Sequence, residues 1–205
     1  VLVEAVRGGR LPIHEAGLGE LLESHQDRVT WTSDPKALGT CELIICSADS
    51  PTDAQHCSDL SPIEALLKIA AEQASAETVL VVLSQVPPGF TRQVARRLRQ
   101  RRQDVQVFGQ VETLIIGQAV ERALQPERLI VGCERPTTPL PAYYAEFLKS
   151  FGCPIYRMDY ESAELAKIAI NLFLVSSVTV TNTLAEVCEA VGAKWNDIMP
   201  ILSSD

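Results

Sequence analysis

Three polar side chains stand close together in a long apolar stretch between Glu161 and Val191. Glu164 precedes Lys167 by three residues, and Asn171 follows Lys167 by four. In an α-helix this spacing places all three on one face. An ammonium and a carboxamide on a shared face can both donate hydrogen bonds to one oxygen and stabilise negative charge that develops there. The pattern therefore indicates a site for an alkoxide or oxyanion.

A simpler interpretation is that Glu164 and Lys167 form an exposed ion pair at the start of the helix. Asn171 favours the site, because apolar residues flank it on both sides and a buried carboxamide needs hydrogen-bond partners. The spacing alone does not identify the reaction, so both interpretations stay open at this point.

Short β-rich runs and helical patterns alternate along the first three quarters of the chain. Strands are expected at Arg28–Thr32, Glu42–Ser47, Val79–Ser84, Val105–Phe108, Leu129–Gly132 and Ile155–Met158. Helices are expected at Leu18–Ser24, Pro35–Leu38, Ser61–Ala74, Phe90–Gln103, Ala119–Ala123 and Pro141–Phe151. This alternation predicts the α/β class, with a doubly wound, Rossmann-like parallel sheet and right-handed crossovers.

The pattern changes near Asp159, after which no further strand is expected. One long helix over Glu161–Val191 is predicted to end at Gly192, and a short helix follows over Asn196–Leu202. We therefore expect a Rossmann-like domain over residues 1–159 and the start of an all-α region over residues 160–205. Helices as long as this one usually bridge domains or pack in an oligomer.

The charge balance argues against nucleic acid and anionic membranes as partners, because the formal net charge is -8 and the pI is about 5.0. One local exception is a set of arginines, which we interpret as a solvated helix face because no aromatic residues interleave with it. The set is Arg92, Arg96, Arg97, Arg99, Arg101 and Arg102. No run of 18 uninterrupted apolar residues occurs, so no membrane span is expected.

The six cysteines lack any CxxC pair and fall partly inside apolar runs, which favours reduced thiols in a cytoplasmic protein over a disulfide framework. The three histidines, His14, His25 and His56, are far apart and lack ligand spacing, so no metal site is expected. Residues 1–9 carry neither a basic n-region nor an apolar core, so they are not expected to be a signal peptide.

An ordered set of segments resembles the UDP-glucose/GDP-mannose dehydrogenase family. The segments are "RGGRLPIHEAGLGELL" (Arg7–Leu22), "VTWTSDPKAL" (Val29–Leu38), "CELIICSADSPT" (Cys41–Thr52), "LVVLSQVPPGFTR" (Leu80–Arg92), "VETLIIGQAVERALQPERLIVG" (Val111–Gly132) and "ESAELAKIAINLFLVSSVTVTNTLAEVCEAVGA" (Glu161–Ala193). Single matches are weak, whereas their order along almost the whole chain is specific.

The resemblance implies two Rossmann-like domains joined by a central helix that forms a homodimer interface. It also implies oxidation of the C6 hydroxymethyl of a UDP-sugar to a uronic acid, by two hydride transfers to NAD. Lys167 and Asn171 would then stabilise the C6 oxygen, and Glu112 would be the acid/base that assists thioester hydrolysis. The loops implied to contact NAD contain Ser50, Pro51, Thr52, Ser84 and Gln85.

The chain departs from the family pattern in several places. The glycine-rich dinucleotide fingerprint would lie upstream of Val1 and the nucleophilic cysteine beyond Asp205, so these 205 residues by themselves are expected to be inactive. Gln85 stands where the family has Thr, and Ile116 stands where it has a second Glu. These two residues indicate a divergent subfamily or a protein in which the second oxidation is impaired.

Two other functions compete with this interpretation. One is a non-catalytic module of the same fold that binds a nucleotide sugar or a dinucleotide, which Gln85 and Ile116 favour. The other is an unrelated dehydrogenase of the 3-hydroxyacyl or 6-phosphogluconate type, which also carries a Lys and an Asn on its long helix. The segments "PIHEAGL" and "QPERLIVG" argue against this second alternative.

Overall fold

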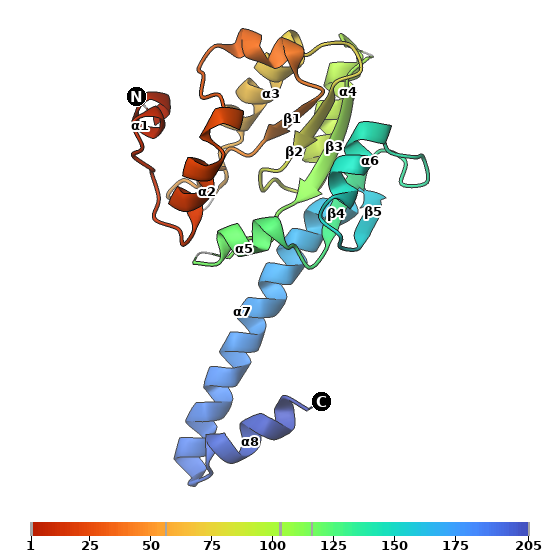
Figure 1. Cartoon of the computed structure of the whole chain (residues 1–205). Helices are drawn as coiled ribbons and strands as arrows, with labels where there is room; N and C mark the ends of the chain where they lie inside the picture. Colours follow the sequence, from red (N-terminus) through yellow and green to blue (C-terminus); the bar gives the residue numbers. More distant parts are fainter. Residues whose placement is uncertain (1, 56, 103, 116, 205) are drawn as a thin grey trace. The chain divides into compact units, whose positions relative to one another are not determined.

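A computed structural model gives the fold of the chain and describes residues 2–55, 57–102, 104–115 and 117–204. The chain forms two compact units, Val1–Leu165 and Ala166–Asp205. The first unit contains a five-stranded sheet in the order β1-β2-β3-β4-β5 (Figure 1). Its strands are β1 (Leu43–Cys46), β2 (Val79–Val82), β3 (Gln106–Val111), β4 (Leu129–Cys133) and β5 (Ile155–Asp159).

The sheet is mixed rather than wholly parallel. Strands β1, β2 and β3 are parallel neighbours and β4 is parallel to β5, but β3 and β4 are antiparallel. A parallel connection would need a helix that crosses a face of the sheet. The helix between β3 and β4, α5 (Ala119–Leu124), buries none of its residues and so covers no face. The α/β class and the Rossmann-like architecture are confirmed, with this one reversal.

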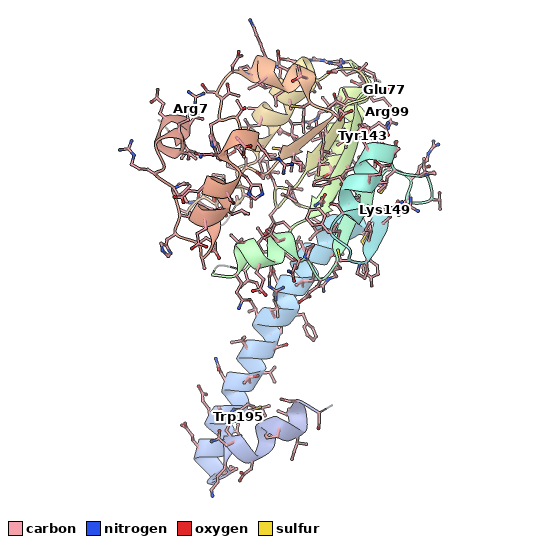
Figure 2. The ribbon with its side chains drawn as sticks, viewed as in Figure 1. Arg7, Glu77, Arg99, Tyr143, Lys149 and Trp195 are labelled. Carbon is pink, nitrogen blue, oxygen red and sulfur yellow. The ribbon has the colours of Figure 1, made fainter. Side chains whose placement is uncertain are left out.

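Helices cover both faces of the sheet, as the burial of all four β2 residues requires. Leu80 and Val82 pack in one cluster with α3 (Ser61–Gln73) and α4 (Phe90–Arg99). Val79 and Val81 point the other way and pack with residues of α6 (Ala142–Lys149). On that second face the hydroxyl of Tyr143 donates a hydrogen bond of 2.7 Å to the carbonyl of Glu77, just before β2 (Figure 2).

Most of the expected elements are confirmed, including all five strands from Glu42 onward. The strand expected at Arg28–Thr32 is wrong: Arg28 ends a 3-10 turn, η1 (Gln26–Arg28), and Val29 and Trp31 are each 37% exposed instead of buried in a sheet. The segment expected to be helical from Pro35 is a 3-10 helix, η2 (Pro35–Thr40). The remaining helices are α1 (Leu2–Arg7), which was not expected, α2 (Leu18–Ser24), α7 (Tyr160–Val191) and α8 (Trp195–Leu202).

The arginine-rich segment of α4 and its C-terminal end is largely paired with carboxylates. The pairs are Arg92–Glu161, Arg97–Glu64, Arg99–Glu134 and Arg102–Asp104. Each pair cancels a positive charge on this surface, in keeping with a solvated helix face. The helix predicted to reach Gln103 ends at Arg99, and residue 103 lies outside the described part of the chain.

The start of α7 packs tightly against β4 through a glycine. Tyr160 and Ala163 are 2% and 1% exposed, and the Tyr160 hydroxyl donates to the carbonyl of Val107 at 2.6 Å. A Cβ atom placed on Gly132 would lie 3.0 Å from the Ala163 Cβ and 3.3 Å from the Tyr160 Cα. Gly132 is therefore required by close packing and not by its backbone angles.

A salt bridge fixes the same end of α7 to α4. Arg92 donates to both carboxylate oxygens of Glu161, one of them at 2.7 Å, and its guanidinium lies 5.3 Å from the centre of the Tyr160 ring. The hydrogen bond from Arg92 lowers the pKa of Glu161 to about 2, against a smaller opposing effect of burial. The carboxylate of Glu161 is thus charged at any physiological pH.

The second unit consists of the rest of α7 and of α8. Gly192 adopts a left-handed conformation with φ 75, and the N–H of Ala193 donates to the carbonyl of Cys188 at 2.9 Å. This is the hydrogen bond of a Schellman motif, so α7 ends at the position that was predicted from Gly192. Cys188 is buried, in agreement with a role in packing.

Replacement of Gly132 by alanine is expected to lower the thermal unfolding midpoint of the full-length protein. The added methyl group has no space against Ala163 and Tyr160, and overpacking of this kind costs about 1–3 kcal/mol. Gly19→Ala is the matched control: a Cβ added at Gly19 would have no atom within 4 Å and the residue lies inside α2, so alanine should preserve or raise stability. Equal midpoints for Gly132→Ala and wild type would contradict the packing described here.

The stability that Glu161 contributes is expected to depend on pH. Its pKa is depressed in the folded state, so the contribution is complete above the unfolded value of about 4.3 and is lost as pH falls toward 2. The difference in unfolding midpoint between wild type and Glu161→Gln should therefore be largest near pH 7 and shrink steadily below about pH 5. Because the Glu161 side chain is 42% exposed, solvent screening keeps the difference small.

Glu64→Gln is the control for this measurement, since it removes the partner of another α4 arginine, Arg97, in a more exposed pair. Those side chains are 45% and 62% exposed, so the substitution should change the midpoint little at any pH. A Glu161 effect of constant size between pH 7 and pH 3 would show that the ion pair is not its source.

Candidate active site

Three loops meet at the edge of the sheet where β1, β2 and β3 end. Because these strands are parallel, their carboxyl ends lie together, as in other open α/β sheets that bind ligands there. Together with the segment before α2, the loops line an open cavity of about 1050 Å³. Its lining is Ile13, His14, Glu15, Ser47, Ala48, Asp49, Ser50, Thr52, Ser58, Leu83, Ser84, Gln85, Glu112, Leu114 and Ala119.

Most residues that the sequence analysis assigned to cofactor binding line this one cavity. Ser50 and Thr52 come from the loop after β1, and Ser84 and Gln85 from the loop after β2. Pro51 lies between two lining residues but does not line the cavity itself. The structure thus brings four of the five together, while their role toward a cofactor stays a prediction.

Two of the cavity hydroxyls also hold the loops in place. Ser50 Oγ donates a hydrogen bond of 3.0 Å to the carbonyl of Gln85, which links the loop after β1 to the loop after β2. Ser84 Oγ donates to the carbonyl of Cys46 at 3.4 Å, and the backbone N–H of Leu83 donates to the same carbonyl at 2.8 Å. The side chain of Gln85 is exposed at the cavity.

Two glutamates shape the third side of the cavity. Glu112 follows the last residue of β3, is half-buried, and accepts a hydrogen bond from the backbone N–H of Leu114. Glu15 accepts hydrogen bonds from the N–H groups of Gly117 and Ala119, at 3.0 and 2.9 Å, at the start of α5. Ile116, which stands where the family has a second glutamate, lies outside the described residues.

Sequence reasoning did not single out several cavity residues as site residues, namely His14, Glu15, Ser47, Asp49 and Ser58. Ser47 and Asp49 could have been found from their place directly after β1. Ser58 reaches the cavity because Thr52 and Ser58 pair in an isolated β-bridge, and Asp53 Oδ1 accepts the N–H of Cys57 inside that loop at 2.8 Å. The Cys57 thiol is exposed.

Lys167 and Asn171 belong to the second unit, where they lie one turn apart on α7. Lys167 is half-buried. Asn171 is exposed, as are the neighbouring Leu172 and Phe173, at 65% and 75%. The expectation of a buried carboxamide is therefore wrong for the single chain, because the described residues leave this part of α7 uncovered. The catalytic roles of both residues stay predictions.

Glu164, the first of the three polar residues, belongs to the first unit. It is 8% exposed, and its carboxylate accepts hydrogen bonds from the backbone N–H groups of Gly89 and Thr91. The helical spacing relates Glu164 only to its neighbours on α7, so it gives no signal for this contact to a distant loop.

Family models match nearly the whole chain. Residues 1–151 match the NAD binding domain of the UDP-glucose/GDP-mannose dehydrogenase family, and residues 161–205 match its central domain. The chain belongs to this family. The resemblance inferred from the ordered sequence segments is confirmed.

Curated relatives agree with this assignment. The chain is 28% identical over 197 residues to the UDP-glucose 6-dehydrogenase TuaD of Bacillus subtilis, covering 93% of this chain and 42% of the relative. It is 29% identical over 205 residues to the UDP-glucose 6-dehydrogenase of Rhizobium meliloti, covering 96% and 47%. The chain therefore spans about half the length of the curated relatives it matches.

The fold also matches a solved structure of the family. A UDP-glucose dehydrogenase from the archaeon Pyrobaculum islandicum superposes with a TM-score of 0.85 at 25% identity, covering 100% of this chain and 49% of that one. The match of residues 1–151 to the NAD binding domain of the family assigns NAD as the cofactor of this chain.

The cavity fits one end of such a cofactor. Half of its polar lining residues carry small hydroxyl groups, which can both donate to and accept from ribose hydroxyls or a carboxamide. Gln85 adds a side chain that can do the same. In the described part of the chain no group of three His, Cys, Asp or Glu side chains could hold a metal ion.

By length and composition alone, α7 meets the criteria for a membrane-crossing helix, which the sequence analysis did not expect. Residues 161–205, which include most of this helix, match the central domain of the dehydrogenase family.

Proposed function

We propose that this protein oxidises the C6 hydroxymethyl of a UDP-sugar to a carboxylate, in two hydride transfers to NAD, as a UDP-glucose 6-dehydrogenase does. The observation that carries the proposal is the cavity at the ends of β1, β2 and β3, which gathers Ser84, Gln85 and Glu112 in a chain of this family. The full activity is proposed for the whole protein, in which residues 1–159 contribute NAD binding and residues 160–205 begin the dimerisation region.

The roles of individual residues follow from their chemistry. The Lys167 ammonium and the Asn171 carboxamide would donate hydrogen bonds to the C6 oxygen and stabilise it as negative charge develops. Glu112 would accept a proton from the water that hydrolyses the thioester, or donate one during that step. Ser50, Thr52, Ser84 and Gln85 would orient NAD, and Pro51 would shape the loop between the first two. NAD, when bound, accepts the hydride that leaves C6.

A non-catalytic module that binds a nucleotide sugar or a dinucleotide is the alternative. Gln85 favours it, because a glutamine replaces the threonine of the family at a residue that lines the cavity. Such a module would bind NAD or the sugar nucleotide without turnover.

We also propose that two copies pair through α7 in the cytoplasm. Exposed apolar side chains lie along and around this helix, and a contiguous apolar surface is normally covered by a partner. They include Leu172, Phe173, Leu174, Val175, Val178 and Val180, which are 57–75% exposed. All six cysteines are free thiols, which suits a reducing compartment.

The full-length protein is expected to form NADH when supplied with NAD and UDP-glucose or a related UDP-sugar, with two NADH produced per sugar oxidised. Absorbance at the NADH band measures the rate, and separation of the products identifies the uronic acid. Tight binding of NAD or UDP-sugar without NADH would establish the non-catalytic alternative, and a single NADH per sugar would show that oxidation stops at the aldehyde.

Lys167→Ala is expected to lower kcat by about 10²–10³, the loss that follows removal of one oxyanion donor. Lys149→Ala is the control: this lysine ends α6, on the second face of the sheet (Figure 2), and the substitution should leave kcat unchanged. A change within twofold for Lys167→Ala would refute its role as an oxyanion donor.

The dimer is tested by sedimentation of the full-length protein at micromolar concentration. Wild type should sediment as a dimer or a larger even-numbered assembly, and replacement of Phe173, 75% exposed, by aspartate should shift it toward the monomer. A monomeric wild type would refute the pairing.

A further inference from the structure

Helix α4 begins with a residue that cannot cap it. Gly89 occupies the N-cap position, adopts φ 93, and makes no side-chain hydrogen bond to the helix. The first N–H groups of a helix have no partner within it, and they carry the positive end of the helix dipole. The Phe90 N–H donates to the carbonyl of Pro87 at 3.1 Å, but Gly89 offers no side-chain acceptor for the other N–H groups at this end.

Glu164 supplies this acceptor from the second turn of α7. One carboxylate oxygen accepts the N–H of Gly89 at 2.5 Å, and the other accepts the N–H of Thr91 at 2.8 Å. The side chain is 8% exposed, so water competes little for these bonds. A carboxylate placed at a helix N-terminus is also favoured by the helix dipole.

The capped residues are the far end of the loop that lines the cavity. At its near end, the carbonyl of Gln85 accepts the hydrogen bond from Ser50, and Val86 is buried at 7% exposure. Pro87 and Pro88 follow, and a proline has no N–H to hold the loop. Glu164 is thus the side chain that fixes the loop where it enters α4.

We infer that Glu164 is a positioning residue for cofactor binding, which it serves by holding the Ser84–Gly89 loop in the conformation that presents Gln85 to the cavity. The inference rests on the proposed function, since it assumes that Gln85 contacts NAD. It differs from the roles proposed for Lys167 and Asn171, because Glu164 would touch neither substrate nor cofactor.

Glu161 provides a matched control. It lies three residues before Glu164 on α7 and also binds α4, but through the side chain of Arg92 and not through the loop backbone. Loss of either carboxylate weakens the attachment of α7 to α4. Only loss of Glu164 should disturb the loop at the cavity.

The test compares wild type, Glu164→Gln and Glu161→Gln as full-length proteins. Glu164→Gln should speed hydrogen exchange of the peptide containing the Gly89 and Thr91 amides at least about tenfold. It should raise the Kd and KM for NAD by about tenfold, with kcat and the KM for UDP-glucose within about threefold of wild type. Glu161→Gln should lower the unfolding midpoint but leave exchange and NAD affinity near wild type. If Glu164→Gln does not fold, Glu164→Asp, which keeps the charge on a shorter side chain, replaces it.

Each outcome decides a separate point. Unchanged exchange of the two amides would overturn the cap, whether or not the protein is an enzyme. Faster exchange with unaltered NAD affinity would leave Glu164 a purely structural cap and overturn its positioning role. Wild type that binds NAD but forms no NADH would refute the proposed oxidation alone, because NAD affinity still reports on the loop. Wild type without NAD affinity would overturn both.

Discussion

Backbone hydrogen bonds join β1, β2 and β3 in parallel, and this arrangement brings three loops to one edge of the sheet. Serine and threonine hydroxyls, Gln85 and Glu112 share a cavity because their strands point the same way. A reversal of any of these strands would carry its loop to the opposite edge. The parallel pairing of the buried apolar strands therefore determines where the cavity forms. The polar residues reach it because they stand at the strand ends.

The antiparallel pairing of β3 and β4 has a different role. In this pairing β4 runs in the direction opposite to β3, and its Gly132 lies where α7 starts. A residue without a side chain then admits Tyr160 and Ala163 at close range. The two glutamates that follow on α7 extend this contact, Glu161 to a side chain of α4 and Glu164 to its backbone. Sheet, loop and helix are thus joined at one place by packing, an ion pair and a helix cap.

Local patterns predicted most of this fold. The apolar runs of β1 to β5 and the glycine that ends α7 act through neighbouring residues, so the sequence displays them directly. The antiparallel direction of β4 goes with a helix, α5, that covers no face of the sheet. The cap on α4 joins residues more than seventy positions apart. Neither has a local signal. The segment at Val29 and Trp31 has the composition of a strand, but a strand requires a neighbour, which composition does not reveal.

The loop between Thr52 and Ser58 contains a thiol that a chemical reagent can label. Its two ends are paired in a β-bridge and line the cavity, while Cys57 within it carries the exposed thiol among six cysteines. Cys46, Cys133 and Cys188 are buried, and burial raises the pKa of Cys133 to about 11, which keeps that sulfur unreactive toward electrophiles. A maleimide dye would therefore react more readily at Cys57 than at the three buried thiols, and from a position next to the cavity-lining Ser58 its emission would report on whatever enters.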